Sequence, residues 1–391
     1  MRSGDSMGSI FMRGHEKQDL SCSSAGILWR EFLPAVILFP SLLGGCASTP
    51  QPPRVEVNPV RLEHARYVEV TYTSHRPPEI SYLERLPAKV AHPRGVMCEP
   101  REPAPRPWTR GAWYWKTHHL LTRTRARRRL RREMRRLGLN QLDLEVERPL
   151  GALSRLVAEL ETRGIRVVAL TGEPADIDHP KRLETTINAV LDFNRNHVHG
   201  FSGLQFDIEP YALPDFARQK RRDYLRYARL IRDIRARIGR AIPWSVVVPF
   251  WFDQVPWKGG SLLTYVQRQA DAVVIMAYRS RYPAVLALAR PGLCEGQRLG
   301  KPVYLGIETA SLPDQDHFFL TRHEFRRELQ NAKGHLDLRR RITMADRVVY
   351  HYAVKGSRLS FHSHPDRLRR LLGRRPAYAS FAGWILEGLG S

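Results

Sequence analysis

The segment Phe201-Ser-Gly-Leu-Gln-Phe-Asp-Ile-Glu209 is a short, largely apolar run that ends in two carboxylates, Asp207 and Glu209. It is the fourth of eight such runs that follow one another from about residue 110. Most of them are rich in Val, Ile and aromatic residues and nearly continuous in hydrophobicity, which is typical of strands buried on both faces. The runs are residues 113–115, 142–146, 165–170, 201–208, 244–250, 272–277, 302–307 and 381–386.

Helical patterns lie between these runs. One apolar stripe at helical spacing consists of Ala126, Leu130, Met134 and Leu137, and a second consists of Tyr224, Tyr227, Leu230, Ile231 and Ile234. Eight strands that alternate with helices predict the α/β class and a single (β/α)8 TIM-like barrel over residues 106–391.

One interval breaks the alternation. Between residues 307 and 381 the chain is far longer than one helix needs, and residues 347–353 inside it also have the composition of a strand. Either 347–353 or 381–386 could therefore be the eighth strand. We prefer 381–386, because a helical pattern over residues 365–372 leads into it.

The N-terminal region indicates the compartment. Residues 33–45 form an apolar run that is too short to span a bilayer but has the length of a signal-peptide core, and Arg30 precedes it. The run ends in Leu43-Gly-Gly-Cys46, which resembles the lipobox of bacterial lipoproteins. The resemblance implies cleavage before Cys46 and acylation of that residue, including its new amino group. The alternative is a buried strand with an incidental cysteine.

Residues 1–45 are then a lipoprotein signal region. Its first 30 residues are long and mixed for a signal, which fits a true start at Met12 or a later codon. Ala47 does not provide the inner-membrane retention signal that Asp gives in similar lipoproteins. The resemblance thus implies a lipid-anchored protein of the cell envelope, on the periplasmic face of an outer membrane.

Residues 46–105 are predicted to be the lipidated cysteine, a Pro-rich linker and an arm. Residues 66–72 alternate as one strand would, and no partner strand is visible in the sequence, so we expect it to lie against the main domain. Cys98 and Cys294 remain after processing, and an oxidising compartment would permit a disulfide between them, although sequence cannot show that they meet.

The net charge is strongly positive. Lys and Arg number 63 against 39 Asp and Glu, a formal charge of +24, which predicts attraction to nucleic acid, acidic polysaccharide or anionic lipid. Nine arginines fall within residues 123–136, opposite the buried stripe, so they line either a solvated helix face or a contact with anionic lipid or polysaccharide. A lipoprotein signal argues against nucleic acid, and we expect a membrane-anchored monomer.

Carboxylates and aromatic residues are predicted at the C-terminal strand ends, where barrel enzymes carry their catalytic groups. Carboxylates accompanied by flat aromatic platforms are what carbohydrate cleavage requires, because one acid protonates the leaving oxygen and others stabilise the oxocarbenium-like charge. The carboxylates are Glu173, Asp207, Glu209, Asp253 and Glu308, and the aromatic residues are Trp113, Trp115, Trp251, Tyr278 and Trp384.

The spacing of the central pair sharpens this hypothesis. Residues i and i+2 of a strand share a face, so Asp207 and Glu209 should both point to the barrel axis while Phe206 and Ile208 face the helices. Two carboxylates held so close have pKa values that move apart, which keeps one proton near neutrality. That suits Glu209 as the acid and Asp207 as its electrostatic partner. The alternative is a structural pair held by arginine.

The segment 201–209 also resembles the fourth-strand signature of family 18 glycoside hydrolases, the chitinase-like barrels. Met276-Ala-Tyr278 and Gly383-Trp384 are similar to two further regions of that family. The resemblance implies that Glu209 is the general acid/base, that Asp207 orients a 2-acetamido group of the substrate, and that Tyr278 hydrogen-bonds this group. Trp384 would form the floor of the site. Glu308, Asp253, Trp251, Trp115 and Glu173 are expected to contact the sugar.

Two positions of the signature depart from the family, because Ser202 and Gln205 stand where it has aspartates. The missing acids favour a non-catalytic carbohydrate-binding or scaffolding lipoprotein, whereas Glu209 favours a glycosidase acting on a polysaccharide or amino-sugar polymer. A carboxylate metal site for another hydrolysis is a third hypothesis. No cofactor or metal is predicted, since the cysteines have no zinc-site spacing and His118-His119 have no third ligand nearby.

Overall fold

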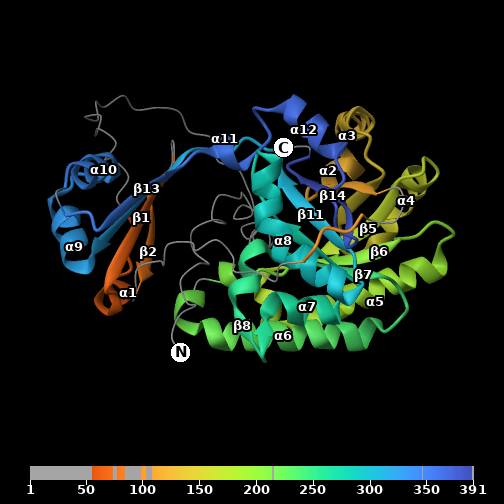
Figure 1. The fold of residues 1–391 in the computed structure, drawn as a ribbon, viewed down its shortest axis with the longest axis horizontal. Helices are drawn as coiled ribbons and strands as arrows, with labels where there is room; N and C mark the ends of the chain where they lie inside the picture. The colour runs from red at the N-terminus through yellow and green to blue at the C-terminus, as the bar shows by residue number, and fades with distance from the viewer. Residues whose placement is uncertain are drawn as a thin grey trace, which may run out of the picture. The chain divides into compact units, whose positions relative to one another are not determined.

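The computed structural model describes residues 55–73, 77–83, 98–102, 108–213, 215–345 and 347–389. The chain divides into two compact units, each with its own sheet (Figure 1). The larger unit comprises the described parts of 87–314 and 354–391, and the smaller one those of 9–86 and 315–353. The proposed signal region and Cys46 lie outside the described residues.

The larger unit is a closed barrel of eight parallel strands, as predicted (Figure 1). Each strand coincides with one of the eight apolar runs, and the run at 381–386 is the eighth strand, so that preference is confirmed. The strands are β3 (Thr109–Tyr114), β4 (Gln141–Glu145), β5 (Arg166–Thr171), β6 (Gly203–Phe206), β7 (Trp244–Pro249), β10 (Ala272–Met276), β11 (Val303–Glu308) and β14 (Phe381–Glu387).

Helices follow the strands and surround the barrel (Figure 1). In α3 the buried residues are Leu130, Met134 and Leu137, three of the four members of the predicted stripe. The helices are α2 (Thr117–Thr122), α3 (Thr124–Leu137), α4 (Ser154–Glu161), α5 (Pro180–Asn196), α6 (Phe216–Ile238), α7 (Leu262–Gln269), α8 (Tyr282–Leu299), α11 (Gly356–Leu359) and α12 (Pro365–Leu372). Short 3-10 helices η2 (Leu150–Leu153), η3 (Pro174–Ile177), η4 (Pro210–Ala212) and η5 (Phe250–Gln254), with the small strands β8 (Pro256–Trp257) and β9 (Gly260–Ser261), complete the connections.

Contacts across the barrel fix which side chains point inward. Trp113 on β3 donates its indole N–H to Gln205 on β6, on the far side of the interior. Ile275 on β10 instead lies against Gly292 of α8 and therefore faces outward. Because side chains alternate along a strand, Gln205 on β6 and Met276 on β10 point inward, and Asp207, Glu209 and Tyr278 follow directly after the ends of these two strands.

The closure of the barrel requires a glycine. β14 pairs with β3, and Gly383 is the partner of Thr109. A Cβ atom on residue 383 would lie 2.2 Å from the carbonyl oxygen of Thr109, which is too close for any side chain. Glycine at this position lets the last strand approach the first closely enough to pair.

The smaller unit contains a four-stranded sheet of order β13-β12-β1-β2. Its strands are β1 (Tyr67–Thr73), β2 (Glu79–Leu83), β12 (Gln315–Thr321) and β13 (Tyr350–Val354), and its helices are α1 (Pro59–His64), α9 (Arg322–Asn331) and α10 (His335–Met344). The strand near 66–72 is therefore a central strand with two antiparallel partners, β2 and β12, rather than a lone strand against the barrel.

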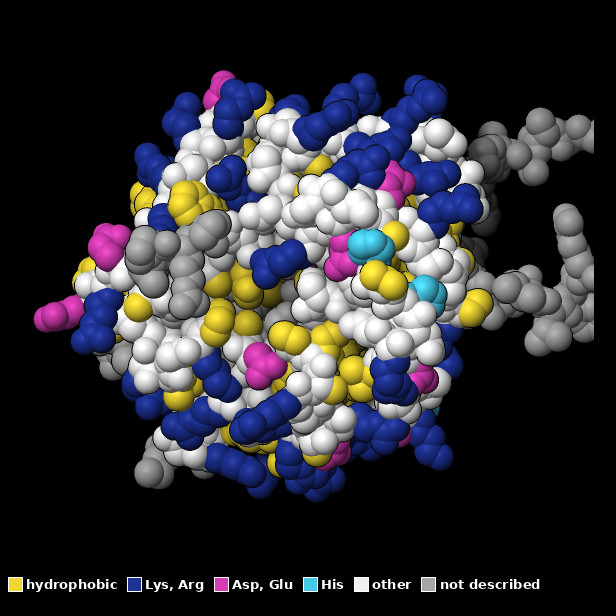
Figure 2. Space-filling view, turned by 90° about the vertical axis from the view of Figure 1, so that its right-hand side faces the viewer, with side chains coloured by type: hydrophobic (Ala, Val, Ile, Leu, Met, Phe, Trp, Pro, Cys, Tyr) yellow, Lys and Arg dark blue, Asp and Glu magenta, His cyan; other side chains and the backbone are white. Residues whose placement is uncertain are grey.

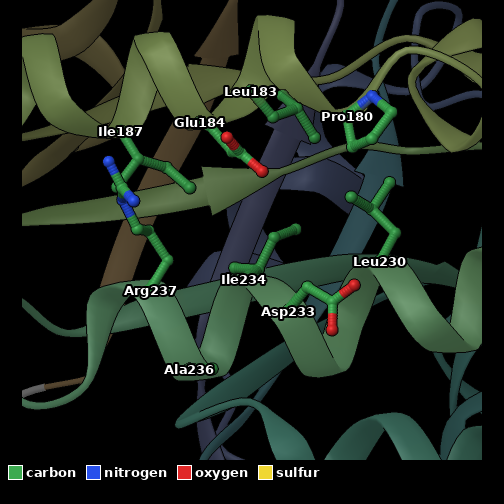
Figure 3. Close-up of a pocket in the computed structure, with 9 residues that line it drawn as sticks. All are labelled: Pro180, Leu183, Glu184, Ile187, Leu230, Asp233, Ile234, Ala236 and Arg237. Carbon is green, nitrogen blue, oxygen red and sulfur yellow. The ribbon is translucent and has the colours of Figure 1, made fainter.

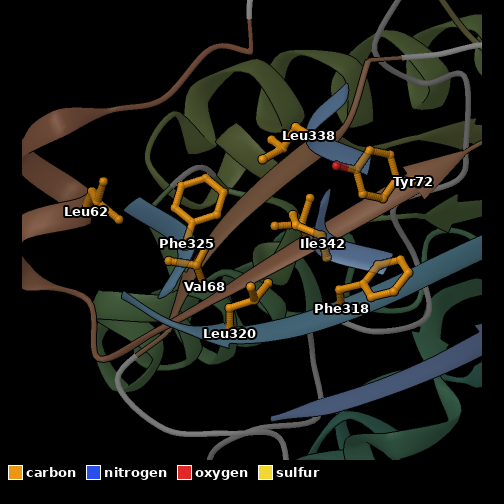
Figure 4. Close-up of a cluster of buried hydrophobic side chains, with 9 residues drawn as sticks. Leu62, Val68, Tyr72, Phe318, Leu320, Phe325, Leu338 and Ile342 are labelled. Carbon is orange, nitrogen blue, oxygen red and sulfur yellow. The ribbon is translucent and has the colours of Figure 1, made fainter. Parts of the chain in front are cut away.

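The segment 315–353 consequently contributes no strand to the barrel, although the sequence placed all of 106–391 there. The rival eighth strand at 347–353 corresponds to β13 of the smaller sheet. The apolar face of this smaller sheet forms a separate core with α9 and α10 (Figure 4). The buried side chains are Leu62, Val68, Val70, Tyr72, Phe318, Leu320, Phe325, Leu338 and Ile342.

The surface carries the excess positive charge that the composition predicts. Figure 2 shows many Lys and Arg side chains around the margin of the visible face, with fewer Asp and Glu among them. No helix within the described ranges is long and apolar enough to cross a membrane.

Cys98 and Cys294 form a disulfide that ties the segment at 98–102 to α8, with their Cα atoms 5.4 Å apart. The same segment is bonded through Arg101 N–H to the carbonyl of Ala377.

We predict that Cys294→Ala lowers the free energy of unfolding by about 2–4 kcal/mol, because the bond closes a long loop in the unfolded chain. Denaturant unfolding of the oxidised wild type and the variant measures the difference, and peptide mapping without reductant should recover the linked pair. Equal stability, or two free thiols in the wild type, would contradict this pairing.

Candidate active site

Asp207 and Glu209 lie just beyond the C-terminal end of β6 and are almost buried, with 4% and 9% of their surface exposed. The strand ends at Phe206, and Pro210 begins the short helix η4 directly after Glu209. Proline lacks an N–H for a strand ladder, so the chain turns here and holds Glu209 at the mouth of the barrel.

A glycine just after the neighbouring strand β5 allows the backbone of that strand to lie close to Asp207. The N–H of Asp207 donates to the carbonyl of Thr171 at 2.9 Å. Gly172, which follows Thr171, has φ +132°, and a Cβ atom on it would lie 2.5 Å from the carbonyl oxygen of Asp207. The end of β5 can approach Asp207 this closely only because residue 172 has no side chain.

Tyr211 orients the carboxyl group of Glu209. Its hydroxyl donates a hydrogen bond of 2.7 Å to Glu209 Oε1. Burial, together with the charges of Glu209 and Asp207, raises the pKa of Tyr211 well above its usual value, so the phenol remains a donor. The ring of Trp251 packs against Tyr211 with centroids 5.0 Å apart. Trp251, which is 2% exposed, thus helps to hold Tyr211 in place.

Tyr278 lies near four carboxylates. Burial raises its pKa well above the usual value, and the charges of Glu387, Glu308, Asp207 and Glu209 raise it further. Four carboxylates from β6, β11 and β14 are therefore close enough to act on one phenol that follows β10. Asp207, Glu209 and Glu308, three of the carboxylates that the sequence predicts at the strand ends, are among these four.

The other two carboxylates are held by defined donors. Glu308 is fully buried, and its Oε1 accepts hydrogen bonds from the backbone N–H groups of Thr309 and Ala310 at 2.8 and 2.6 Å. Glu387 Oε2 accepts the indole N–H of Trp115 at 3.1 Å. This bond brings the predicted Trp115 to the mouth, on the side where β14 meets β3.

A further carboxylate, Asp143 on β4, lies inside the barrel and is completely buried. Its Oδ1 accepts the side-chain N–H of Gln141 at 2.6 Å, and Gln205 donates to Ser245 Oγ at 3.1 Å. Burial raises the pKa of Asp143 to about 7, while hydrogen bonds from Gln141 and Gln205 and the charge of Arg166 oppose the rise. Gln205, at a position where the signature has an acid, thus lies beside a carboxylate from another strand.

The raised pKa of Asp143 predicts a pH-dependent stability. Between about pH 4 and pH 7 the unfolded chain loses this proton while the folded chain keeps it, so stability falls as pH rises. The cost reaches roughly 4 kcal/mol at about 1.36 kcal/mol per unit of pKa shift. Asp143→Asn should remove it, so the stability of the variant relative to wild type should increase from pH 4 to pH 7 and then level off.

Denaturant unfolding of both proteins at pH 4, 5.5, 7 and 8 measures this difference. Asp253, whose pKa burial also raises to about 7, is present in both proteins and its contribution cancels. A difference that does not change with pH would show that Asp143 is ionised throughout.

Three predicted site residues do not join the cluster. Trp384 is fully buried, packs against Phe381 and Tyr282, and donates its indole N–H to the carbonyl of Arg374 at 3.0 Å, so it belongs to the helix layer and cannot floor the site. Its parity on β14 is opposite to that of Glu387, which explains the outward direction.

Glu173 and Asp253 also have other roles. Glu173 is exposed, caps the short helix η3 and pairs with Arg182 at 3.3 Å. Asp253 lies in η5 with hydrogen bonds to Gln254, and it is not among the carboxylates that act on Tyr278.

The sequence reasoning missed Tyr211, Glu387 and Asp143. Parity could have found two of them, because Asp143 lies within the strand-like 142–146 and Glu387 follows the run 381–386 directly. Tyr211 carried no signal, since its return to Glu209 depends on the turn of η4.

Neither of two surface grooves is lined by a residue of the carboxylate cluster. One, of about 340 Å³, lies between α5 and α6 and is lined by Leu183, Ile187 and Ile234 with Glu184, Asp233 and Arg237 around them (Figure 3). The other, of about 350 Å³, belongs to the smaller unit. Within the part of the chain that the structure describes, no group of three or more His, Cys, Asp or Glu residues could hold a metal ion.

Comparison with known proteins does not assign the chain to a family. No family model and no curated sequence matches the chain. Among solved structures, the spore cortex-lytic enzyme SleL of Bacillus megaterium is similar with 12% identity over 75% of this chain and 72% of that chain, at a TM-score of 0.39. The class V chitinase from Nicotiana tobaccum has 12% identity over 73% and 95%, at 0.38.

A β-1,3-glucanosyltransferase of Rhizomucor miehei, determined as an active-site mutant with laminaritriose, has 13% identity over 71% of this chain and 86% of that chain, at a TM-score of 0.39. All three are carbohydrate-active enzymes by name. At such identities and TM-scores, these likenesses say nothing about the reaction of this chain.

Proposed function

We propose that the chain is a glycosidase that cleaves a polysaccharide or amino-sugar polymer by general acid catalysis, with Glu209 as the acid. The observation that carries this proposal is the cluster of Asp207, Glu209, Glu308 and Glu387 around Tyr278 at the C-terminal end of the barrel. Barrel enzymes carry their chemistry at this end, and glycoside cleavage uses paired carboxylates.

The proposed step begins with a protonated Glu209 whose orientation is set by the Tyr211 hydroxyl. The proton passes to the glycosidic oxygen as the bond from that oxygen to the anomeric carbon breaks. Asp207 stabilises the positive charge that develops on the sugar, and Tyr278, which remains protonated, offers a hydrogen bond to the substrate. The oxygen of a water molecule then bonds to the anomeric carbon while one of its protons returns to Glu209. Trp115 is positioned by Glu387 to contact a neighbouring sugar.

A carbohydrate-binding protein without catalysis is the second candidate. The neutral Gln205 favours it, because this residue lies two positions before Asp207 on the inward row and carries no charge. The nearby Asp143 supplies a carboxylate in the interior, which supports the enzyme instead.

The leading prediction is that Glu209→Gln lowers kcat by about 10²–10⁴-fold while leaving the fold unchanged, since a general acid contributes a factor of that size. Purified residues 47–391 would be incubated with a panel of chitin, β-glucan, peptidoglycan and acidic polysaccharides, and release of reducing ends measured. Glu184→Gln, an exposed carboxylate change on α5, is the matched control and should keep full activity.

Full activity in Glu209→Gln would assign the acid to another carboxylate, with Glu308 the first to test. If no polymer is cleaved but one binds the wild type and Glu209→Gln equally, the chain is a binding protein.

We further propose that the protein is anchored to the cell envelope through an acylated Cys46, on the periplasmic face of an outer membrane. The order of Arg30, the apolar run and the small residues before Cys46 supports this. Cys46→Ser should therefore move the protein from the membrane to the soluble fraction or leave it unprocessed. Fractionation and intact-mass measurement test this, and a variant that remains membrane-bound at the mature size would refute the anchor.

A further inference from the structure

Basic side chains adjoin the acidic mouth at the connection after β3, and this arrangement bears on the substrate. The four carboxylates around Tyr278 would repel an anionic group placed among them. The connection after β3 has the opposite character. Trp115 bonds to Glu387 at the mouth, and the next residue, Lys116, is exposed.

The positive charge of this connection affects the pKa of His119. Burial lowers the pKa of His119, and the neighbouring charges of His118, Arg123 and Lys116 lower it further. The side chains of His118, Arg123 and Lys116 are therefore close enough to His119 to act on it. The connection from Lys116 to Arg123 is a region of positive potential that starts one residue after a side chain of the proposed site.

α3 continues the positive charge. Its 14 residues include eight arginines and one carboxylate, Glu133. Leu130, Met134 and Leu137 face the barrel, and Arg125, Arg128, Arg132 and Arg135 are exposed on the other side.

The arginines of α3 also repel one another. Five pairs lie four residues apart within the helix, the spacing at which like charges destabilise it. α5, by contrast, offsets three basic residues with Glu184 and Asp192. Arg131 pairs with Glu159 of α4 and Arg136 with Glu133, which neutralises only a part of the charge. An anionic partner on this face would relieve the repulsion.

We propose that the substrate is an acidic polysaccharide whose carboxylate or phosphate groups bind a basic ledge formed by Lys116, Arg123 and the exposed arginines of α3. This inference rests on the proposed glycosidase function and specifies its substrate class. The sugar at the cleavage point occupies the carboxylate cluster without an anionic group near the acids. The polymer then passes Trp115 and places its charged groups on the ledge.

The position of the ledge favours the substrate over a membrane surface as its partner. The ledge begins beside the side chain that bonds to Glu387, so a polymer in the mouth reaches it without leaving the protein. Arginine also binds carboxylate and phosphate in a bidentate geometry, which suits discrete anionic groups on a chain.

The test compares two variants of equal net charge in residues 47–391. The ledge variant carries Gln at Arg125, Arg128, Arg132 and Arg135. The control carries Gln at Arg218, Arg221, Arg229 and Arg232, which are exposed on α6. Circular dichroism confirms that both variants are folded. The binding probes are polygalacturonate as the acidic polymer, laminarin as the neutral one, and vesicles of phosphatidylglycerol and phosphatidylethanolamine.

We expect the ledge variant to bind polygalacturonate about tenfold more weakly at low salt, because four modest ion pairs are lost, while the α6 variant stays within about twofold of wild type. Binding of wild type to polygalacturonate should weaken as salt rises, and binding to laminarin should not differ between the variants.

Equal losses in the two variants would show a general charge effect and overturn the ledge. A loss confined to the vesicles would assign α3 to the membrane, and no binding of polygalacturonate by wild type would also overturn the proposal. The proposed function is judged separately through Glu209→Gln. If Glu209→Gln keeps full activity, the role of Glu209 is refuted and the ledge result is unchanged. If wild type cleaves neutral polymers only, the glycosidase function stands and the acidic substrate class is refuted.

Discussion

The pairing of β14 with β3 is the contact on which the site depends. It closes the barrel, and it is possible because Gly383 leaves room for the carbonyl of Thr109. In the closed barrel the side chains of Glu387 and Trp115 are hydrogen-bonded at 3.1 Å. In an open sheet the two residues would lie at opposite edges. The same closure turns Trp113 into the interior, where it reaches Gln205 across the barrel.

The interior of the barrel is more polar than the apolar runs indicate. Gln141, Asp143, Gln205 and Ser245 form a hydrogen-bonded layer beneath the mouth. A fully buried carboxyl group is tolerated there because amide donors bind it and because burial, which raises its pKa to about 7, favours its neutral form. Gln205, as a neutral residue, can serve as donor to one neighbour and acceptor to another, which an ionised acid could not do. The departure from the family signature at this position is therefore accompanied by a carboxylate two strands away.

The fold separates charge of opposite sign over short distances. Carboxylates converge on the barrel axis because inward residues of parallel strands meet at one end, whereas arginines occupy the outer faces of the helices, where water screens them. The smaller unit contributes neither to the barrel strands nor to the carboxylate cluster. It has its own sheet and its own apolar core.

The sequence by itself determined the eight barrel strands and the position of Asp207, Glu209, Tyr278 and Glu308 at or just after their C-terminal ends. These follow from local rules, namely continuous hydrophobicity and the two-residue alternation along a strand. Only the tertiary structure decided that 315–353 leaves the barrel to pair with β1, since partners about 250 residues apart leave no local signal. It also decided that Trp384 faces the helices, that Glu173 turns toward Arg182, and that Asp143, Tyr211 and Glu387 belong beside the acids. Those outcomes depend on which strands become neighbours and where each connection turns, and both are properties of the closed barrel rather than of any one segment.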